Sequence, residues 1–481
     1  MPSCDALIIG GGTNGLAAAT RLALKGRSVT LLESGPTLGG ALALSHTMRD
    51  MDARVMSGMD LARHGLNFHP ALQTTLLGGP PLTVQRGKTT GPDAAAFAAL
   101  HAKLTAFARV LAPFRALTPP RLTTKGNEWG KLARLGFGIR TLGQQDFREF
   151  LRMVLINIAD TAEDELSDDR LKGLLAFDAT LGAWAGPRSP NTLILLLNQL
   201  ATGADIQIPQ GGMAQIATAM EASARAAGVT IVLNAPVTKI LIENDRAVGV
   251  AANDTYRAPV TLSAMSPRLT FQHLIGPRHL DAGFFDRTRF IRSRGATAKL
   301  TLTLNSPPDL PDLQQRFVIA PSVDAVETAF NPVKYGEVPD SPVMEFVFPT
   351  AFDPVHDGPH TLSANVQFAP HDPKAGLETA RAQMLANTLK VLHAHVPGLN
   401  PTDVKLLMPQ DIESRYGMVG GNWHHGELAV EQMLFLRPLR ETAQYATPLP
   451  GLYLASAGSH PGGGINGAAG WNAAGKVLEA T

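Results

Sequence analysis

Apolar runs and glycine-rich turns alternate along the first forty residues of the chain. Residues 5–10 form a short apolar run, residues 16–25 are rich in small residues, and residues 28–33 form a second apolar run that ends in an acid. Buried parallel strands are nearly continuous apolar runs, and a helix usually joins successive strands of such a sheet. The pattern therefore predicts a β-α-β unit at the start of the chain.

A long central segment, residues 93–203, shows helical rather than strand periodicity. Apolar side chains recur at helical spacing, for example at Phe97, Leu100 and Leu104, as expected where one face of a helix is buried. The acidic stretch 160–169 predicts a helix start, since carboxylates are favourable at the positive end of the helix dipole. We interpret the apolar stretch 191–202 as a buried helix, with docking to a membrane surface as the alternative.

Strand patterns return after residue 209. The predicted strands are 229–233, 237–243, 247–252, 256–264, 298–304, 343–348, 361–368 and 451–456, and the predicted helices are 213–227, 377–391 and one from about 465. The first of these elements predict a second βαβ-like unit with added antiparallel strands. The later ones predict a sheet roofed by helices.

The turn between the first strand and the first helix carries Gly10, Gly12 and Gly15, in the order G-x-G-x-x-G. The first glycine permits a tight turn, the second lets the backbone approach a pyrophosphate, and the third lets helix and strand pack closely. The N–H groups of the helix N-terminus would face the phosphates. Glu33, eighteen positions after Gly15, stands where a carboxylate accepts hydrogen bonds from a ribose. Together these features predict dinucleotide binding rather than a purely structural turn.

The C-terminal segment 451–467 repeats the order of strand, glycine-rich turn and helix. Two such turns at opposite ends of the chain predict one long cofactor held between them. FAD fits, with its adenine and pyrophosphate at the first turn and its flavin against the C-terminal helix, whose N-terminus would stabilise the negative charge of the reduced ring. Apart from these two turns, the second of which includes Gly462, Gly464 and Gly467, the sequence has no further G-x-G-x-x-G, so we expect no separate nicotinamide-binding domain.

These patterns predict an α/β fold of two domains, for which 481 residues are sufficient. A discontinuous, Rossmann-like FAD-binding domain is expected from residues 1–75, 205–265 and 440–481. Residues 76–204 and 266–439 are expected to form an inserted α+β substrate domain that caps the site.

Composition narrows the functional class. The net charge of +1 gives no case for nucleic-acid binding. Cys4 is the one cysteine, so the chain has neither an intrachain disulfide nor the cysteine pair of a disulfide reductase, and a cysteinyl flavin is not expected. Because the first predicted strand begins at residue 5, we expect no secretory signal. We expect a cytoplasmic protein, with peripheral contact to a membrane as an alternative.

Several motifs resemble those of the phytoene desaturase and phytoene dehydrogenase-related flavoproteins; they lie in residues 5–40, 209–213, 411–413, 437–438, 445–448 and 458–464. Two further segments, 187–190 and 420–426, are more similar to the branch called pyridine nucleotide-disulphide oxidoreductase domain-containing. The resemblance covers nearly the whole chain. It implies an FAD-binding fold of the glutathione-reductase and amine-oxidase type, but it implies no particular substrate.

The motifs and the resemblance together give the residues expected to contact FAD: Gly10, Gly12, Thr13, Asn14, Gly15, Glu33, Ser34, Gly39, Gly40, Ala41, Val237, Gly458, Ser459, Gly463, Gly464 and Ile465. Two of them depart from the pattern of the wider group. Ala41 replaces an arginine that reaches the pyrophosphate in most relatives, which counts against the amine oxidases. Ser459 replaces an aspartate common near this turn, a smaller change because a hydroxyl also forms hydrogen bonds.

Candidate catalytic and substrate-binding residues are few. His460, in the C-terminal turn, is a candidate for flavin contact or proton transfer, against the alternative that it only fixes the turn. Trp423, His424 and His425 stand in a glycine-rich loop and are candidates for lining the substrate pocket, against ordinary loop packing. We expect no metal site, because no further ligand stands at a suitable spacing, and the sequence has no G-x-S-x-G hydrolase motif.

We therefore expect an FAD-dependent oxidoreductase that takes a hydride from a hydrophobic or amphipathic small organic molecule to flavin N5. Oxygen or a quinone is the expected electron acceptor. One alternative is a flavin amine or amino-acid oxidase, and another is a protein that uses FAD as a redox scaffold for a protein partner. The sequence leaves the substrate and the oligomeric state open.

Overall fold

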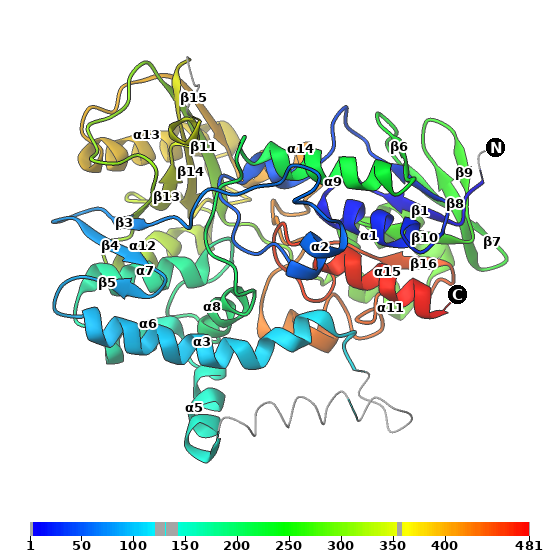
Figure 1. Ribbon diagram of the computed structural model, residues 1–481, viewed down its shortest axis with the longest axis horizontal. Helices are drawn as coiled ribbons and strands as arrows, with labels where there is room; N and C mark the ends of the chain where they lie inside the picture. Colours follow the sequence, from blue (N-terminus) through cyan, green and yellow to red (C-terminus); the bar gives the residue numbers. More distant parts are fainter. Residues whose placement is uncertain (1–2, 121–129, 131–142, 354–357, 481) are drawn as a thin grey trace.

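The computed structural model describes residues 3–120, 130, 143–353 and 358–480. Within these residues, a five-stranded and an eight-stranded β-sheet lie toward opposite ends of the molecule, and helices pack against both (Figure 1). The two chain termini lie at the end that holds the five-stranded sheet. A small three-stranded sheet lies at the same end. The molecule therefore has two lobes, each built around one large sheet.

The five-stranded sheet is entirely parallel, in the order β16-β10-β1-β2-β6. Every residue of β1, β2 and β10 is buried, as expected for a parallel sheet covered on both faces. Its strands are β1 (Ala6–Ile9), β2 (Val29–Leu32), β6 (Thr230–Val232), β10 (Val260–Ser263) and β16 (Leu452–Leu454). They come from all three segments predicted for the cofactor domain, and the predicted α/β class is confirmed.

Each face of this sheet packs against a different layer. Ile8 and Leu31 pack with apolar helix residues on one face, whereas Leu7 and Ile9 pack on the other with the three-stranded sheet. The helices of the first face are α1 (Thr13–Ala23), α2 (Ala53–Gly58), α9 (Ala214–Ala226) and α15 (Ala468–Ala480). The second face is covered by β7 (Lys239–Glu243), β8 (Arg246–Ala251), β9 (Thr255–Arg257), α10 (Pro267–Leu269), η2 (Thr270–Ile275), η3 (Pro277–His279) and α11 (Ala282–Arg289). The core of this lobe thus continues past the boundary expected at residue 265.

The eight-stranded sheet is mixed, in the order β15-β11-β14-β13-β12-β3-β4-β5. Strands β3 and β12 pair in parallel and the other neighbours are antiparallel. The strands are β3 (Thr74–Leu76), β4 (Leu82–Gln85), β5 (Lys88–Thr89), β11 (Thr297–Leu304), β12 (Arg316–Ile319), β13 (Val343–Val347), β14 (His360–Gln367) and β15 (Pro401–Leu407). This is the mixed sheet expected of an α+β substrate domain.

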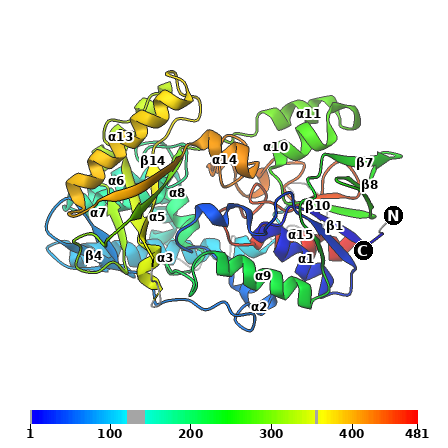
Figure 2. The ribbon, with the colours of Figure 1, turned by 90° about the horizontal axis from the view of Figure 1, so that it is seen from above.

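Helix α13 (Leu377–His395) lies along one face of this sheet (Figure 2). Ala298, Leu300 and Leu302 of β11 belong to the same apolar core as Met384 of that helix. Because side chains alternate along a strand, Lys299 points to the opposite face. That second face is turned toward the rest of the molecule, and its polar residues become important at the site.

A layer of helices completes the second lobe. It consists of α3 (Ala94–Ala116), α5 (Gly143–Leu155), α6 (Ile158–Glu165), α7 (Asp169–Thr180), α8 (Thr192–Leu200) and α12 (Val323–Phe330). The prediction for 160–169 needs correction, because this stretch starts no single helix. It contains most of α6, which Asn157 caps, and the start of α7, which Asp168 caps through its contacts with Arg170 and Leu171 N–H groups. Short polar side chains before the first turn, rather than the acidic charge alone, set both starts.

Two apolar helices are relevant to the alternative that the protein docks to a membrane surface. Leu193, Ile194 and Leu197 of α8 are buried, which supports the interpretation of 191–202 as a core helix. Helix α3 is long and apolar enough, by length and composition alone, to cross a membrane. Phe97 and Leu104 of α3 belong to the apolar core of the second lobe.

The shorter connections carry the remaining elements, which are η1 (Gly40–Leu44), η4 (Pro332–Tyr335), η5 (Pro349–Phe352), α14 (Pro409–Tyr416), η6 (Val430–Gln432) and η7 (Leu434–Leu436).

Strands β3 to β5, β12 and β15 were not predicted, and the predicted strand 256–264 is two strands, β9 and β10, in different sheets. Pro259 stands between them, and proline cannot donate a ladder hydrogen bond. Strand β3 begins at Thr74, inside the segment assigned to the cofactor domain.

Candidate functional site

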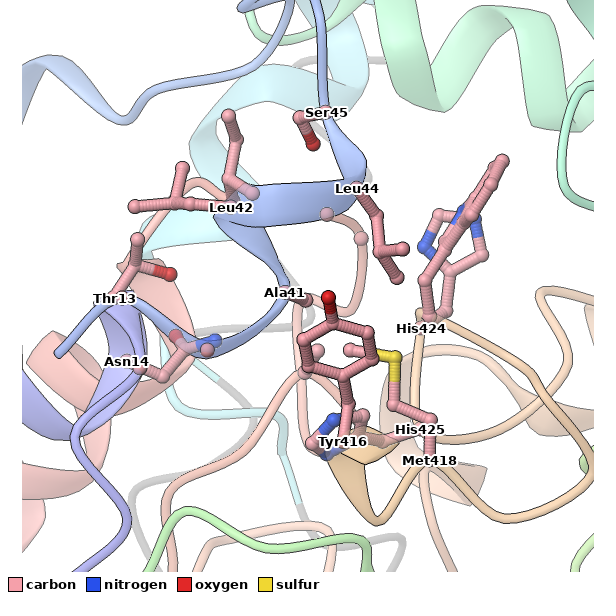
Figure 3. A pocket seen from close by; sticks show the side chains of 18 of the residues that line it. Thr13, Asn14, Ala41, Leu42, Leu44, Ser45, Tyr416, Met418, His424 and His425 are labelled. Atoms are coloured by element: carbon pink, nitrogen blue, oxygen red, sulfur yellow. The ribbon is translucent and has the colours of Figure 1, made fainter. Parts of the chain in front are cut away.

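A cavity of about 490 Å³ runs between the two lobes. The glycine turns of the five-stranded sheet line one end, and polar residues of the eight-stranded sheet, including Glu345 and Asn365, line the other. Figure 3 shows Thr13 on one side of the cavity and Tyr416 and His424 across from it. The site is therefore shared by both lobes.

The first glycine turn has the features of a phosphate-binding turn. Gly12 is the N-cap of α1, and no side chain caps this helix end. A side-chain carbon built on Gly12 would meet nothing within 4 Å, whereas one on Gly15 would lie 1.9 Å from the carbonyl oxygen of Gly10. Gly12 thus borders open space, and Gly15 lets the helix pack on the strand. The N–H groups at the helix start are open to an anion.

Glu33 is fixed at the edge of this turn. Its Oε2 accepts a hydrogen bond from the Gly11 N–H at 2.6 Å, and its Oε1 accepts one from the Gly35 N–H at 2.8 Å and one from the Ser34 hydroxyl at 3.0 Å. A carboxylate has about four acceptor positions and three are used here, so one position remains for a ribose hydroxyl. Both Glu33 and Ser34 line the cavity.

The second tight turn lies directly against the first. The Gly39 N–H donates to the Gly11 carbonyl at 2.9 Å, and Gly39 and Gly40 have φ values of 106° and 51°. These are left-handed conformations that favour glycine. The turn leads into η1, from which Ala41 faces the cavity.

The C-terminal turn contributes Gly463, Gly464 and Ile465 to the same wall. Asp50 lies beside them, and its Oδ2 accepts hydrogen bonds from the Gly464 N–H at 3.1 Å and from Asn466 Nδ2 at 3.2 Å. An aspartate from a distant part of the chain therefore lies beside the C-terminal turn, although serine stands at position 459. Asp50 also lines the cavity, and sequence reasoning missed it because nothing in the local pattern links it to this turn.

All but two of the residues predicted to contact FAD line the cavity: Gly10, Gly12, Thr13, Asn14, Gly15, Glu33, Ser34, Gly39, Gly40, Ala41, Val237, Gly463, Gly464 and Ile465. The exceptions are Gly458 and Ser459. A side-chain carbon on Gly458 would lie 2.4 Å from Pro267 Cδ, so this glycine packs against the chain. Ser459 Oγ is buried and has no hydrogen-bond partner among the described residues. Contact of each of these residues with FAD stays a prediction.

His460 does not line the cavity. Its Nε2 lies 2.6 Å from the carbonyl oxygen of Phe114, near the end of α3, and its own carbonyl accepts a hydrogen bond from the Tyr445 hydroxyl at 3.1 Å. Burial lowers the pKa of His460 to about 4, so the ring is neutral near pH 7. This geometry favours the structural role over the catalytic one, and proton transfer by His460 stays a prediction without support from its position.

Trp423, His424 and His425 line the cavity, as expected for residues of a substrate pocket. The Trp423 Nε1–H donates to His424 Nε2 at 2.9 Å. Burial, and then the charge of Arg437, lower the pKa of His424 to about 3 and that of His425 to about 4. The Nδ1 atoms of both histidines have no hydrogen-bond partner among the described residues. Together with Tyr416 and Met418 they form a mixed aromatic and polar wall (Figure 3).

Arg437 holds this wall in place. The buried guanidinium donates to five backbone carbonyls, those of His424, Gly426, Glu427, Gln432 and Ala457. Burial lowers its pKa to about 9. Because its acceptors belong to the loop that carries the two histidines and to the segment after β16, Arg437 fastens the substrate wall to the C-terminal turn.

Sequence reasoning missed a charged cluster at the far end of the cavity. It consists of His46, Arg49, Asp178, Lys299, Arg316, Glu345 and Asn365. The pattern of β14 carries a signal that could have revealed part of it, because Ser363, Asn365 and Gln367 alternate with Leu362, Ala364 and Val366. A buried strand with one polar face predicts polar contacts across that face.

The residues present fit FAD. The open backbone at Gly12, the uncapped start of α1 and the fixed carboxylate of Glu33 suit its phosphates and ribose. The cavity then continues far enough to border the second lobe. A dinucleotide with a redox ring therefore matches both the turn and the space beyond it.

Comparison with known proteins agrees with this site. Residues 15–478 match the family model described as flavin containing amine oxidoreductase. A rat protein, pyridine nucleotide-disulfide oxidoreductase domain-containing protein 2, is 26% identical over 98% of this chain and 93% of its own length. The neurosporene-forming phytoene desaturase of Cereibacter sphaeroides is 25% identical over 98% of this chain and 94% of its own length. The resemblance expected from the motifs is therefore confirmed.

Solved structures show the same fold. Putrescine oxidase aligns with a TM-score of 0.59 and 16% identity over 99% of each chain. Cyclohexylamine oxidase from Brevibacterium oxydans IH-35A aligns with a TM-score of 0.59 and 15% identity over 100% of this chain and 99% of its own. The chain belongs to the family of flavin-containing amine oxidoreductases and is an FAD-dependent oxidoreductase.

Proposed function

We propose that this protein oxidises a small, amphipathic organic molecule by transfer of a hydride from a substrate carbon to FAD, and that oxygen or a quinone then takes the electrons. The continuity of the cavity carries the proposal. The same space borders Gly12 in the phosphate-binding turn and Glu345 in the eight-stranded sheet. A dinucleotide that begins at the turn therefore extends toward a second lobe that has room for a substrate.

The wall of the cavity supports an amphipathic rather than a purely hydrocarbon substrate. Leu44, Leu181 and Leu195 line it together with Arg49 and Asn365. Apolar side chains of this kind bury a carbon skeleton, and convergent polar groups fix its orientation. A hydrocarbon without polar groups would remove the polar end of the cavity from water without forming a polar contact there, which costs free energy.

FAD supplies the hydride-accepting ring when it is bound. The chain's own residues bind and orient the reactants. The N–H groups at the start of α1 hold the phosphates, and Glu33 holds the ribose. Leu44, Met418 and Trp423 also line the cavity; side chains of this kind would exclude water around a bound substrate, which strengthens the polar contacts within a site.

A flavin amine oxidase is the competing proposal, because amine oxidases are among the proteins of similar fold. An amine oxidase that binds an ammonium group needs a free carboxylate or an aromatic cage. Glu345 is bonded to both Arg49 and Arg316, and Asp178 is paired with the same two arginines. Neither carboxylate is free to receive an ammonium group, so the charged end of the cavity favours a substrate of another class.

Anaerobic reduction of the bound flavin tests the proposal. The purified holoprotein is mixed with alcohols, amines, amino acids, carboxylic acids and hydrocarbons, and the visible absorbance of the flavin is followed. Bleaching by an organic compound, and recovery of colour when oxygen or a quinone is admitted, is the expected result. NADH and NADPH should bleach the flavin slowly, because the glycine-rich turns at both ends of the chain line one and the same cavity. A flavin that no small molecule reduces would instead indicate a redox scaffold, and rapid bleaching by NADH would contradict the proposal.

A further inference from the structure

The eight-stranded sheet carries a row of polar residues, of which Asn365 and Glu345 line the cavity and Lys299 lies behind its wall. Lys299 of β11 is the register partner of Asn365 of β14, and Asn365 is the register partner of Glu345 of β13. Asn365 Nδ2 donates to Glu345 Oε1 at 2.9 Å. Three neighbouring strands thus place three polar side chains in one line on the same face.

Four charged groups of this cluster neutralise one another. Arg49 and Arg316 both bond to Glu345, and both pair with Asp178. Burial alone would raise the pKa of Glu345, but the charges of Arg49 and Arg316 outweigh it and hold that pKa well below its usual range. Two guanidinium groups therefore face two carboxylates, with no charge left over.

Lys299 adds one further positive charge to this cluster when it is protonated. Its Nζ lies 2.6 Å from His46 Nδ1 and 3.3 Å from Asn365 Oδ1, and among the described residues no carboxylate pairs with it. Burial lowers the pKa of Lys299 to about 7. A protonated Lys299 gives the cluster a net positive charge that no side chain around it balances.

His46 contacts the Lys299 amine and also lines the wall of the cavity. Because Nδ1 faces the Lys299 amine, the ring proton is placed on Nε2. That Nε2 lies 3.5 Å from Glu345 Oε1, is buried and has no hydrogen-bond partner among the described residues. A buried N–H without a partner costs free energy unless a ligand accepts from it.

We propose that the substrate carries a carboxylate, which is held at the sheet end of the cavity by His46 and Arg49 and balanced by the charge of Lys299. This inference rests on the proposed oxidoreductase function and names the substrate class of the same site. An incoming carboxylate lies against His46 and Arg49, which both line the cavity, and satisfies the surplus charge. It also orients the molecule, so that its carbon skeleton extends along the apolar wall toward the flavin.

Binding of three probes of equal length to the FAD-loaded protein tests this proposal. The probes are hexanoate, hexanamide and hexylamine. Their binding is measured by the change in the visible spectrum of the flavin and by the thermal stabilisation of the protein. Because FAD already fills the phosphate-binding turn, an anion has to bind elsewhere. Hexanoate should bind about tenfold or more tightly than the amide or the amine, as expected for a hydrogen-bonded ion pair. Equal binding of hexanamide, tighter binding of hexylamine or no binding of hexanoate would overturn the proposal.

Variants of Lys299 test whether this residue causes the preference for hexanoate. Lys299→Met should abolish the preference for hexanoate, whereas Lys405→Met should leave it unchanged, since Lys405 is an exposed lysine on β15 of the same sheet. Lys299→Arg should keep the preference. Wild-type affinity for hexanoate should fall as the pH rises above about 7, because Lys299 then loses its proton. In Lys299→Arg this loss should vanish, since arginine stays charged.

If Lys299→Met fails to fold, the variant Asn365→Asp tests the same proposal. The new carboxylate is nearly isosteric and lies beside the Lys299 amine, so it neutralises the surplus charge within the protein. Hexanoate binding should then weaken about tenfold, and an unchanged affinity would contradict the proposal. Anaerobic bleaching by neutral or amine compounds, with no carboxylate preference, would overturn this inference and leave the oxidoreductase function standing. A protein without reducible flavin would instead remove the function itself.

Discussion

The N–H of Gly470 donates a hydrogen bond to Asn14 Oδ1 at 3.1 Å, although the two residues are 456 positions apart. Asn14 stands in the first turn of α1, and Gly470 in the first turn of α15. The contact locks the phosphate-binding turn to the helix that follows the C-terminal turn. The two ends of the chain thus form one site.

Replacement of Gly470 by alanine should loosen this junction. The new carbon would lie 1.8 Å from the backbone oxygen of Asn14, so the helices have to separate. We expect the free energy of unfolding to fall by about 1–3 kcal/mol, with partial loss of FAD. Gly475→Ala on the same helix is the matched control, because its carbon would meet the end of the Arg21 side chain rather than backbone. Equal stability of the two variants in urea unfolding would contradict the contact.

Gly463→Val should lower FAD occupancy. Gly463 has φ of 101°, and a side-chain carbon there would lie 2.9 Å from Asn466 Nδ2. A β-branched residue is strained in this conformation by about 1–2 kcal/mol, and the cavity wall would shift. Gly228→Val, between α9 and β6, is a control with φ of 90° and open space around it. The flavin absorbance per protein should fall in Gly463→Val and persist in Gly228→Val; full occupancy in both would show that the C-terminal turn is only a connection.

His460→Ala should affect stability more than chemistry. Loss of the ring removes its contact with the Phe114 carbonyl at 2.6 Å, and the loss of one hydrogen bond costs about 0.5–1.5 kcal/mol. Thermal unfolding and the rate of flavin reduction are measured together. A slower reduction at unchanged stability would restore the catalytic role predicted from the sequence.

Acid should destabilise the fold through its buried histidines. Burial lowers the pKa of His46, His425 and His460 to about 4 and that of His424 to about 3. In the unfolded chain these rings titrate near pH 6.5. The unfolded state therefore binds more protons between those values, and the free energy of unfolding should fall as the pH drops from about 6.5 toward 4.

Urea titrations at several pH values check this expectation. His424→Gln removes one titrating ring and should reduce the slope of stability against pH across that window. A free energy of unfolding that stays constant from pH 6.5 to 4 would contradict the neutral, buried state of these histidines.

The sequence predicted the cofactor lobe better than the cap, for a physical reason. The turn at Gly10, Gly12 and Gly15 works through local backbone geometry, which glycine spacing encodes directly. Strands β12 and β15 lie in a mixed sheet whose pairing is set by distant segments, and short strands carry weak periodicity. Accordingly the parallel sheet was predicted, and five of the eight strands of the second sheet were missed.

The same division holds for the site. The residues predicted to border the cofactor stand next to glycines, and nearly all of them line the cavity. The pair of Lys299 and His46 spans 253 positions, so no local pattern brings it together. His460 was predicted from its place beside the turn, but the direction of its side chain depends on α3, which approaches from another part of the chain.

The flavin content of the purified protein tests the central claim most directly. The protein is denatured, and the released cofactor is identified by chromatography and quantified against the chain. FAD at about one molecule per chain is expected, because the turn at Gly12 and the carboxylate of Glu33 are arranged for the adenosine half that FMN lacks. Recovery of FMN, or of no flavin after reconstitution with FAD, would contradict the assignment of this cavity.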